Sequence, residues 1–208
     1  MIKTIIPRFF NILFLAAIAV PGMAGAQELI LDTGTPPGNT ALPILSTGQW
    51  LAAEFKATAG ETLSQFSAYL APNNGSTGNT FSFVLYGGNI VGARNLSQLY
   101  STTGTFSGTT GWSSASADYT IANTGDYWLA VEENATGTEF DVPEETSTST
   151  GPAPALAFAI KGASTFQSSS AGFGLEVSVV PEPVTYGILA GFGLLGVSLC
   201  GQFRRKQA

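Results

Sequence analysis

The 208-residue chain has no histidine and one cysteine. The residues that could act in catalysis or binding are therefore mostly acidic or aromatic. Catalysis by a Ser-His-Asp or Cys-His arrangement is therefore excluded, as are a histidine-ligated metal and an internal disulfide bond. The chain has 14 acidic residues against 8 basic ones, which gives a net charge of −6. An acidic protein repels phosphate backbones, so nucleic acid is not an expected partner.

Adjacent carboxylates occur twice, at Glu132-Glu133 and at Glu144-Glu145. A glycosidase needs two carboxyl groups on either side of one bond, and one of them must be protonated. Neighbouring residues on a strand point to opposite faces, so neither pair builds that arrangement by itself. We therefore expect solvated loop charges and no enzyme, with a hydrolase that uses scattered carboxylates as the alternative.

A second possibility for the acidic residues is calcium, because six acids and no base lie between positions 132 and 145. Extracellular modules bind this ion weakly through several oxygen ligands, although no EF-hand spacing is present. The candidate ligands are Glu139, Asp141 and Glu144. The other interpretation is an acidic loop that repels itself and binds no cofactor.

Three tryptophans could stack on sugar rings, because an indole has an apolar face and a polar edge. Trp50 and Trp128 lie within alternating patterns typical of strands and are expected to fill the core. Trp112 lies in a Gly/Ser/Thr-rich segment that we interpret as a loop. Trp112 is therefore the candidate for an exposed glycan contact.

The N-terminus, residues 1–26, has the organisation of a secretory signal peptide. Two basic residues precede a short apolar run over 9–20, and Ala24-Gly25-Ala26 follows. Signal peptidase recognises small residues in this A-x-A pattern, so Gln27 is predicted to be the mature N-terminus. The alternative is an uncleaved N-terminal anchor.

The C-terminus, residues 180–208, combines three features in order. Val180-Pro181-Glu182-Pro183 comes first, then an uncharged stretch over 184–203, and then a basic cluster in the last residues, 204–208. Those 20 residues match the length of a membrane-spanning helix. The positive-inside rule keeps the basic cluster cytoplasmic and the preceding domain outside. The residues of this cluster are Arg204, Arg205 and Lys206.

This tail resembles the PEP-CTERM sorting signals of Gram-negative bacteria. Pro181, Glu182 and Pro183 match the motif, and Thr185 stands one residue later than the commonest Ser/Thr placement. The resemblance implies recognition by an exosortase, a membrane protease that would release or re-anchor the protein at the cell surface or outside it. It also implies export through the inner membrane of a bacterium that makes exopolysaccharide or biofilm.

The exported middle, residues 27–179, is predicted to be an all-β domain. Short apolar or alternating runs are bounded by Gly, Asn, Pro and Ser, which indicates strands and turns. Regular strands without intervening helices favour an antiparallel β-sandwich of jelly-roll or Ig-like type. The segment over 95–100 is the best candidate for a helical turn. The predicted strands lie within 50–56, 63–70, 81–86, 118–121, 126–131, 155–160 and 173–179.

The same region is similar to choice-of-anchor domains, most closely the R type. The similarity lies in the segments 49–55, 62–70, 83–86, 125–131 and 173–177. It implies an architecture and no established activity.

Together these features predict an exported protein with a structural or adhesive role in an extracellular matrix. Its expected partners are signal peptidase, exosortase, the membrane and exopolysaccharide. A carbohydrate-binding module is the first alternative. The charge separates by region, since residues 27–179 hold 3 basic and 13 acidic side chains, a net charge of −10.

Overall fold

The computed structural model describes residues 27–37, 41–44, 49–73, 79–133, 140–145, 151–162 and 165–180. In these ranges the chain forms strands joined by turns and loops, without a helix. The predicted signal peptide and the predicted membrane helix lie outside them.

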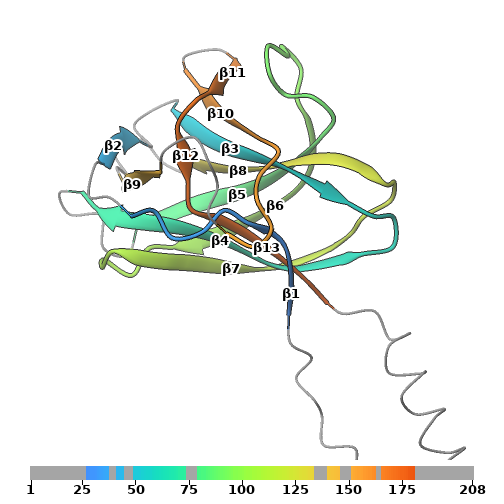
Figure 1. Cartoon of the computed structure of the whole chain (residues 1–208), viewed down its shortest axis with the longest axis horizontal. Helices are drawn as coiled ribbons and strands as arrows, with labels where there is room; N and C mark the ends of the chain where they lie inside the picture. Colours follow the sequence, from blue (N-terminus) through green and yellow to red (C-terminus); the bar gives the residue numbers. More distant parts are fainter. Residues whose placement is uncertain are drawn as a thin grey trace, which may run out of the picture.

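Two antiparallel sheets make up the described part of the chain, which confirms the prediction of a β-sandwich (Figure 1). The seven-stranded sheet has the order β1 (Glu28–Asp32), β13 (Leu175–Val180), β4 (Thr62–Pro72), β9 (Phe140–Glu145) and β12 (Gly172–Phe173). Two further strands belong to this sheet: β2 (Ala41–Ile44) pairs with β9, and β7 (Gly111–Thr120) pairs with β4. The six-stranded sheet has the order β11 (Phe166–Ser169), β10 (Ala157–Lys161), β3 (Trp50–Ala57), β8 (Gly125–Glu133), β5 (Thr80–Gly87) and β6 (Ser97–Thr105).

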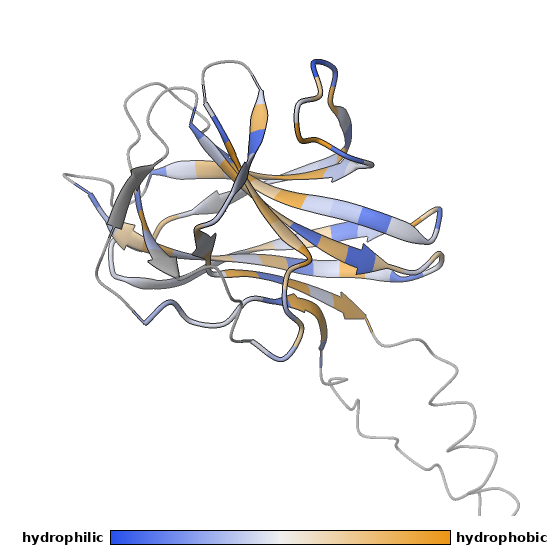
Figure 2. Ribbon diagram, turned by 45° about the horizontal axis from the view of Figure 1, so that its top comes forward, coloured by the Kyte–Doolittle hydropathy of each residue, from blue (hydrophilic) through white to orange (hydrophobic). Residues whose placement is uncertain are grey.

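Alternating side chains explain how the sheets pack. Residues of a strand point by turns to opposite faces, so every second residue of β3 reaches the space between the sheets. Leu51, Ala53 and Phe55 are buried there, and Leu129 and Val131 of β8 join them. Bands of alternating hydropathy along the strands are visible in Figure 2.

The segment over 95–100 is not a helical turn, contrary to the sequence-based expectation. Residues 97–100 begin strand β6, which pairs with β5 along its whole length. Leu96 and Leu99 are three residues apart, as on one face of a helix, but β6 is an edge strand with several exposed side chains. Helical periodicity and a polar edge strand are hard to separate in so short a segment.

Phenylalanines dominate one part of the core between the sheets. The Phe81 ring lies 5.1 Å from Phe83 and 5.6 Å from Phe140, measured between centroids, and both contacts are edge-to-face. Gly104 of β6 lies directly opposite Phe81. A Cβ atom at Gly104 would lie 2.5 Å from the Phe81 ring, so the absence of a side chain makes room for the ring.

We predict that Gly104→Ala destabilises the domain by about 1–3 kcal/mol, because the buried Phe81 ring has little room to move. Gly125→Ala is the matched control, since Gly125 also lies in a strand but a Cβ there meets no atom within 4 Å. Guanidinium unfolding followed by tryptophan fluorescence measures both variants. Equal unfolding midpoints for the two variants would contradict the prediction.

Candidate functional site

The predicted sorting motif begins at Val180, the last residue that the structure describes. Val180 is the last residue of β13, pairs with Thr62 of β4 and is 51% exposed. Pro181, Glu182, Pro183 and the basic residues Arg204, Arg205 and Lys206 lie outside the described residues, as do Ala24 and Ala26. No helix in the described ranges has the length and apolar character needed to cross a membrane.

Both ends of the described fold lie side by side. Strands β1 and β13 pair in antiparallel fashion, with Glu28 opposite Val179 (Figure 1). The first strand therefore starts beside the point where the last strand ends. Gln27, the predicted mature N-terminus, immediately precedes β1 and is exposed.

The calcium candidates are not brought together as a described site. Asp141 lies in β9, where its backbone pairs with Pro43 and Ala71. Glu139 and the side chain of Glu144 lie outside the described residues. Among the side chains that the structure describes, no three His, Cys, Asp or Glu residues are grouped to hold a metal.

Trp112 is not in a loop, which corrects the sequence-based prediction. It is the second residue of β7 and lies opposite Tyr69 of β4. The two rings form an edge-to-face pair with centroids 5.5 Å apart, and both side chains are half-buried. Gly174 leaves room for this pair, because a Cβ atom at that position would lie 3.2 Å from the Trp112 ring.

The other two tryptophans lie on the outer face of the six-stranded sheet. Trp128 is buried as predicted, but it packs outside the sandwich rather than between the sheets. Trp50 was expected in the core and is only half-buried. The Lys161 ammonium lies 3.0 Å from the centroid of its ring, a cation–π contact between cross-strand partners.

A second hydrophobic cluster explains why Trp128 is buried on an outer face. A continuous row of small residues, Ala159–Ala52–Ala130–Val84, crosses β10, β3, β8 and β5. Larger side chains cover this row, and we call the assembly the outer cluster. Its buried members are Ala52, Val84, Tyr86, Ile90, Trp128, Ala130, Ala159 and Phe166.

The loop between β5 and β6 helps to close the outer cluster. Ile90 is buried within it, and Val91 forms an isolated bridge with Phe166 of β11. The Gly92 amide donates a 2.8 Å hydrogen bond to the Phe166 carbonyl. Gly88 and Gly92 have φ angles of 73° and 72°, which glycine adopts without strain. The loop thus connects opposite halves of the six-stranded sheet.

Glu132 is not a solvated loop charge, contrary to the expectation for the acidic pairs. It lies in β8, is 9% exposed, and accepts a 2.5 Å hydrogen bond from the Tyr86 hydroxyl. The sequence contains a signal for this position that was missed. Trp128, Ala130 and Glu132 are two residues apart, so they share one face of the strand.

Burial shifts the pKa values of Glu132, Lys161 and Tyr86. Desolvation raises the pKa of Glu132, while the Tyr86 hydrogen bond and the charge of Lys161 act in the opposite direction. Desolvation also lowers the pKa of Lys161, and nearby Glu132 opposes that shift. The pKa of Tyr86 is raised, first by its burial and then by Glu132. The hydrogen-bond partner of Glu132 is a tyrosine rather than the second carboxyl group that glycoside hydrolysis needs.

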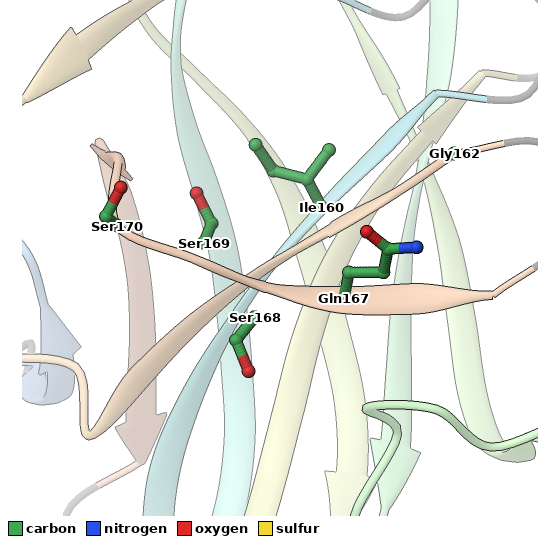
Figure 3. A pocket seen from close by; sticks show the side chains of 6 residues that line it. All are labelled: Ile160, Gly162, Gln167, Ser168, Ser169 and Ser170. Atoms are coloured by element: carbon green, nitrogen blue, oxygen red, sulfur yellow. The ribbon is translucent and has the colours of Figure 1, made fainter.

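A shallow hollow of about 370 Å³ lies along the β10–β11 hairpin (Figure 3). Hydroxyl and amide groups form much of its lining, and none of the described residues that line it is aromatic. The lining residues are Ile160, Gly162, Gln167, Ser168, Ser169 and Ser170.

No protein-family model and no curated protein sequence matches the chain. The fold is similar to part of the crystal structure of the cysteine protease and lectin-like domains of Cwp84, a surface layer associated protein of Clostridium difficile. The sequence identity is 14% and the TM-score is 0.43. The match covers 65% of this chain and 32% of that chain, about a third of its length. The fold assignment therefore rests on the strand pairing itself.

We predict that Glu132 makes the domain less stable as the pH rises. Its folded-state pKa is raised above the ordinary value of 4.5, so the folded state keeps this proton over a pH range in which the unfolded chain has lost it. Stability falls as the pH increases from 4.5 through the folded-state pKa. Urea unfolding across this range measures the effect.

Two variants isolate this contribution. Glu132→Gln removes the titrating group and is expected to flatten the pH profile. Tyr86→Phe removes a hydrogen bond that lowers the Glu132 pKa, so the decline in stability should extend to higher pH. Parallel profiles for the wild-type chain and Glu132→Gln would show that this carboxyl group is not responsible.

Proposed function

We propose that the chain is an exported, non-enzymatic surface protein that an exosortase sorts through its C-terminal tail. Its β-sandwich has a structural or adhesive role in the extracellular polysaccharide of a Gram-negative bacterium. The tail resemblance described above supplies the sorting part of the proposal.

The observation that carries the proposal is the pairing of Glu28 with Val179. The first described strand begins two residues after the predicted signal-peptidase site, and the last described strand includes Val180, the first residue of the proposed sorting motif. The two proposed processing sites therefore flank the described strands, and cleavage after Ala26 would leave β1 intact. A domain tethered at this end would direct its opposite end away from the membrane.

The position of Val180 supports recognition of the motif while the domain is folded. Val180 is the last residue paired in the ladder with β4. Pro181 has no backbone N–H group and cannot donate a ladder hydrogen bond. The residue type at position 181 thus limits ladder pairing beyond Val180.

The environment of Glu132 supports a role without catalysis. Glu132 is shielded from solvent and bonded to Tyr86, so a polymer substrate would not reach it in this conformation. The net charge of −10 on residues 27–179 favours a soluble surface that does not collapse onto anionic matrix.

We predict that the mature protein begins at Gln27. Intact-mass measurement of the protein purified from the exporting host tests this. Cleavage there leaves β1 complete, because that strand starts at Glu28. A mature N-terminus within β1, or a retained residue 1, would contradict the predicted site.

We predict that Glu182→Ala causes retention in the inner membrane of a host that carries an exosortase, because the sorting motif loses its charge. Glu28→Ala is the matched control, since it removes a carboxylate near the same end of the domain. Membrane fractionation with immunodetection measures both variants. The sorting proposal fails if Glu182→Ala and Glu28→Ala are distributed in the same way.

A further inference from the structure

The two outer faces of the sandwich differ in character. The outer cluster with its loop covers part of the six-stranded sheet. On the seven-stranded sheet, β4 and β7 instead carry paired polar residues beside the Trp112–Tyr69 pair. Strand β4 contains no charged side chain, and neither do residues 111–117 of β7. An uncharged region thus lies within a domain of strongly negative net charge.

The aromatic pair provides an amphipathic contact at one end of this face. Trp112 and Tyr69 are neighbours across two strands, and their edge-to-face packing holds both rings in position. Half-buried aromatic side chains add contact area and lose little conformational freedom on binding. Their apolar faces suit the C–H face of a sugar ring, and the indole N–H and phenol O–H suit its hydroxyl groups.

Polar side chains continue from the aromatic pair along the same face. Ser114 pairs with Ser67, and their hydroxyl oxygens lie 3.0 Å apart. The Gln65 amide reaches Ser67 at 3.4 Å, and Ser116 lies opposite Gln65. Ser114 and Ser116 are exposed. We call these residues, together with Trp112 and Tyr69, the β4–β7 face.

The length of the face allows contact with an extended ligand. From Trp112 to Ser116 the strand advances about 13 Å, at about 3.3 Å per residue. A polymer lying along β7 would meet the aromatic pair first and the hydroxyl and amide groups next.

Charge favours a neutral ligand. The β4–β7 face has no cation to pair with an anionic sugar, and Glu176 of β13 lies opposite Ser67 on the neighbouring strand. Glu176 can accept hydrogen bonds from sugar hydroxyls, whereas it would repel uronate or phosphate groups.

We propose that the β4–β7 face binds a neutral polysaccharide, with Trp112 and Tyr69 as the stacking residues and Ser114, Ser116 and Gln65 as hydrogen-bonding residues. This inference rests on the proposed adhesive function and names the class of partner. The β4–β7 face also extends away from the end of the domain that would be tethered to the membrane. Tyr69 is seven residues along β4 from Thr62, the partner of Val180, so the aromatic pair is about 23 Å from the tethered end.

Affinity electrophoresis of the full mature chain in mild detergent tests the proposal. Native gels contain a soluble neutral β-glucan, a neutral galactomannan or, for comparison, anionic alginate. We expect at least one neutral polysaccharide to retard the wild-type chain. Trp112→Ala should weaken that retardation at least tenfold. Ser116→Glu, which changes only an exposed side chain, should weaken it in the same direction without loss of the fold.

Trp50→Phe is the matched control, because it alters a half-buried indole on the other outer face and should bind as the wild type does. The proposal is overturned if neither neutral polysaccharide retards the chain, or if alginate alone does. It is also overturned if Trp112→Ala and Ser116→Glu both bind as the wild type does. Sorting is scored separately by fractionation of Trp112→Ala, which should match the wild type. A failure of binding is thereby distinguished from a failure of the proposed function.

Discussion

Strand β13 is hydrogen-bonded on both sides, to β1 and to β4, and the arrangement of the domain depends on this double pairing. The pairing joins the first described strand to the last, so the described fold starts and finishes at the same end. It also fixes the register of β4, because Val180 lies opposite Thr62. β4 in turn aligns β7, and the Trp112–Tyr69 pair follows from that register.

The outer cluster is a second consequence of strand register. Small residues align across four strands and leave space for Tyr86 and Phe166 to cover them. Within that apolar environment Glu132 accepts a hydrogen bond from Tyr86. A buried carboxyl group is costly unless it is neutral or well paired, which is why its pKa rises. The apolar packing and the unusual titration therefore have the same origin.

The sequence was sufficient to predict the fold class, because period-two alternation is a local property. The core positions of β3 and β8 follow from it directly. Trp112 was misplaced because β7 has small residues on its inner face, such as Ser113 and Ala115, and so looks like a polar loop. Its strand character comes from pairing with β4, more than 40 residues earlier in the chain.

The environment of Glu132 also depends on a residue that is distant in the sequence. Its partner Tyr86 lies 46 residues away, and no local pattern indicates that the two will meet. Trp50 was expected to be buried because alternation reveals which residues share a face, but not what covers that face. Coverage depends on the β5–β6 loop and on β11, whose positions are set by tertiary contacts.

The position of β13 has a mechanical consequence. If Val180 is held at the membrane and a polymer pulls on the opposite end of β7, the load passes along β13 and β4. Antiparallel hydrogen bonds lie perpendicular to the strands, so this force shears many of them at once instead of opening them one by one. The strand that continues into the tether would then be among the hardest to extract, because it is held on both sides.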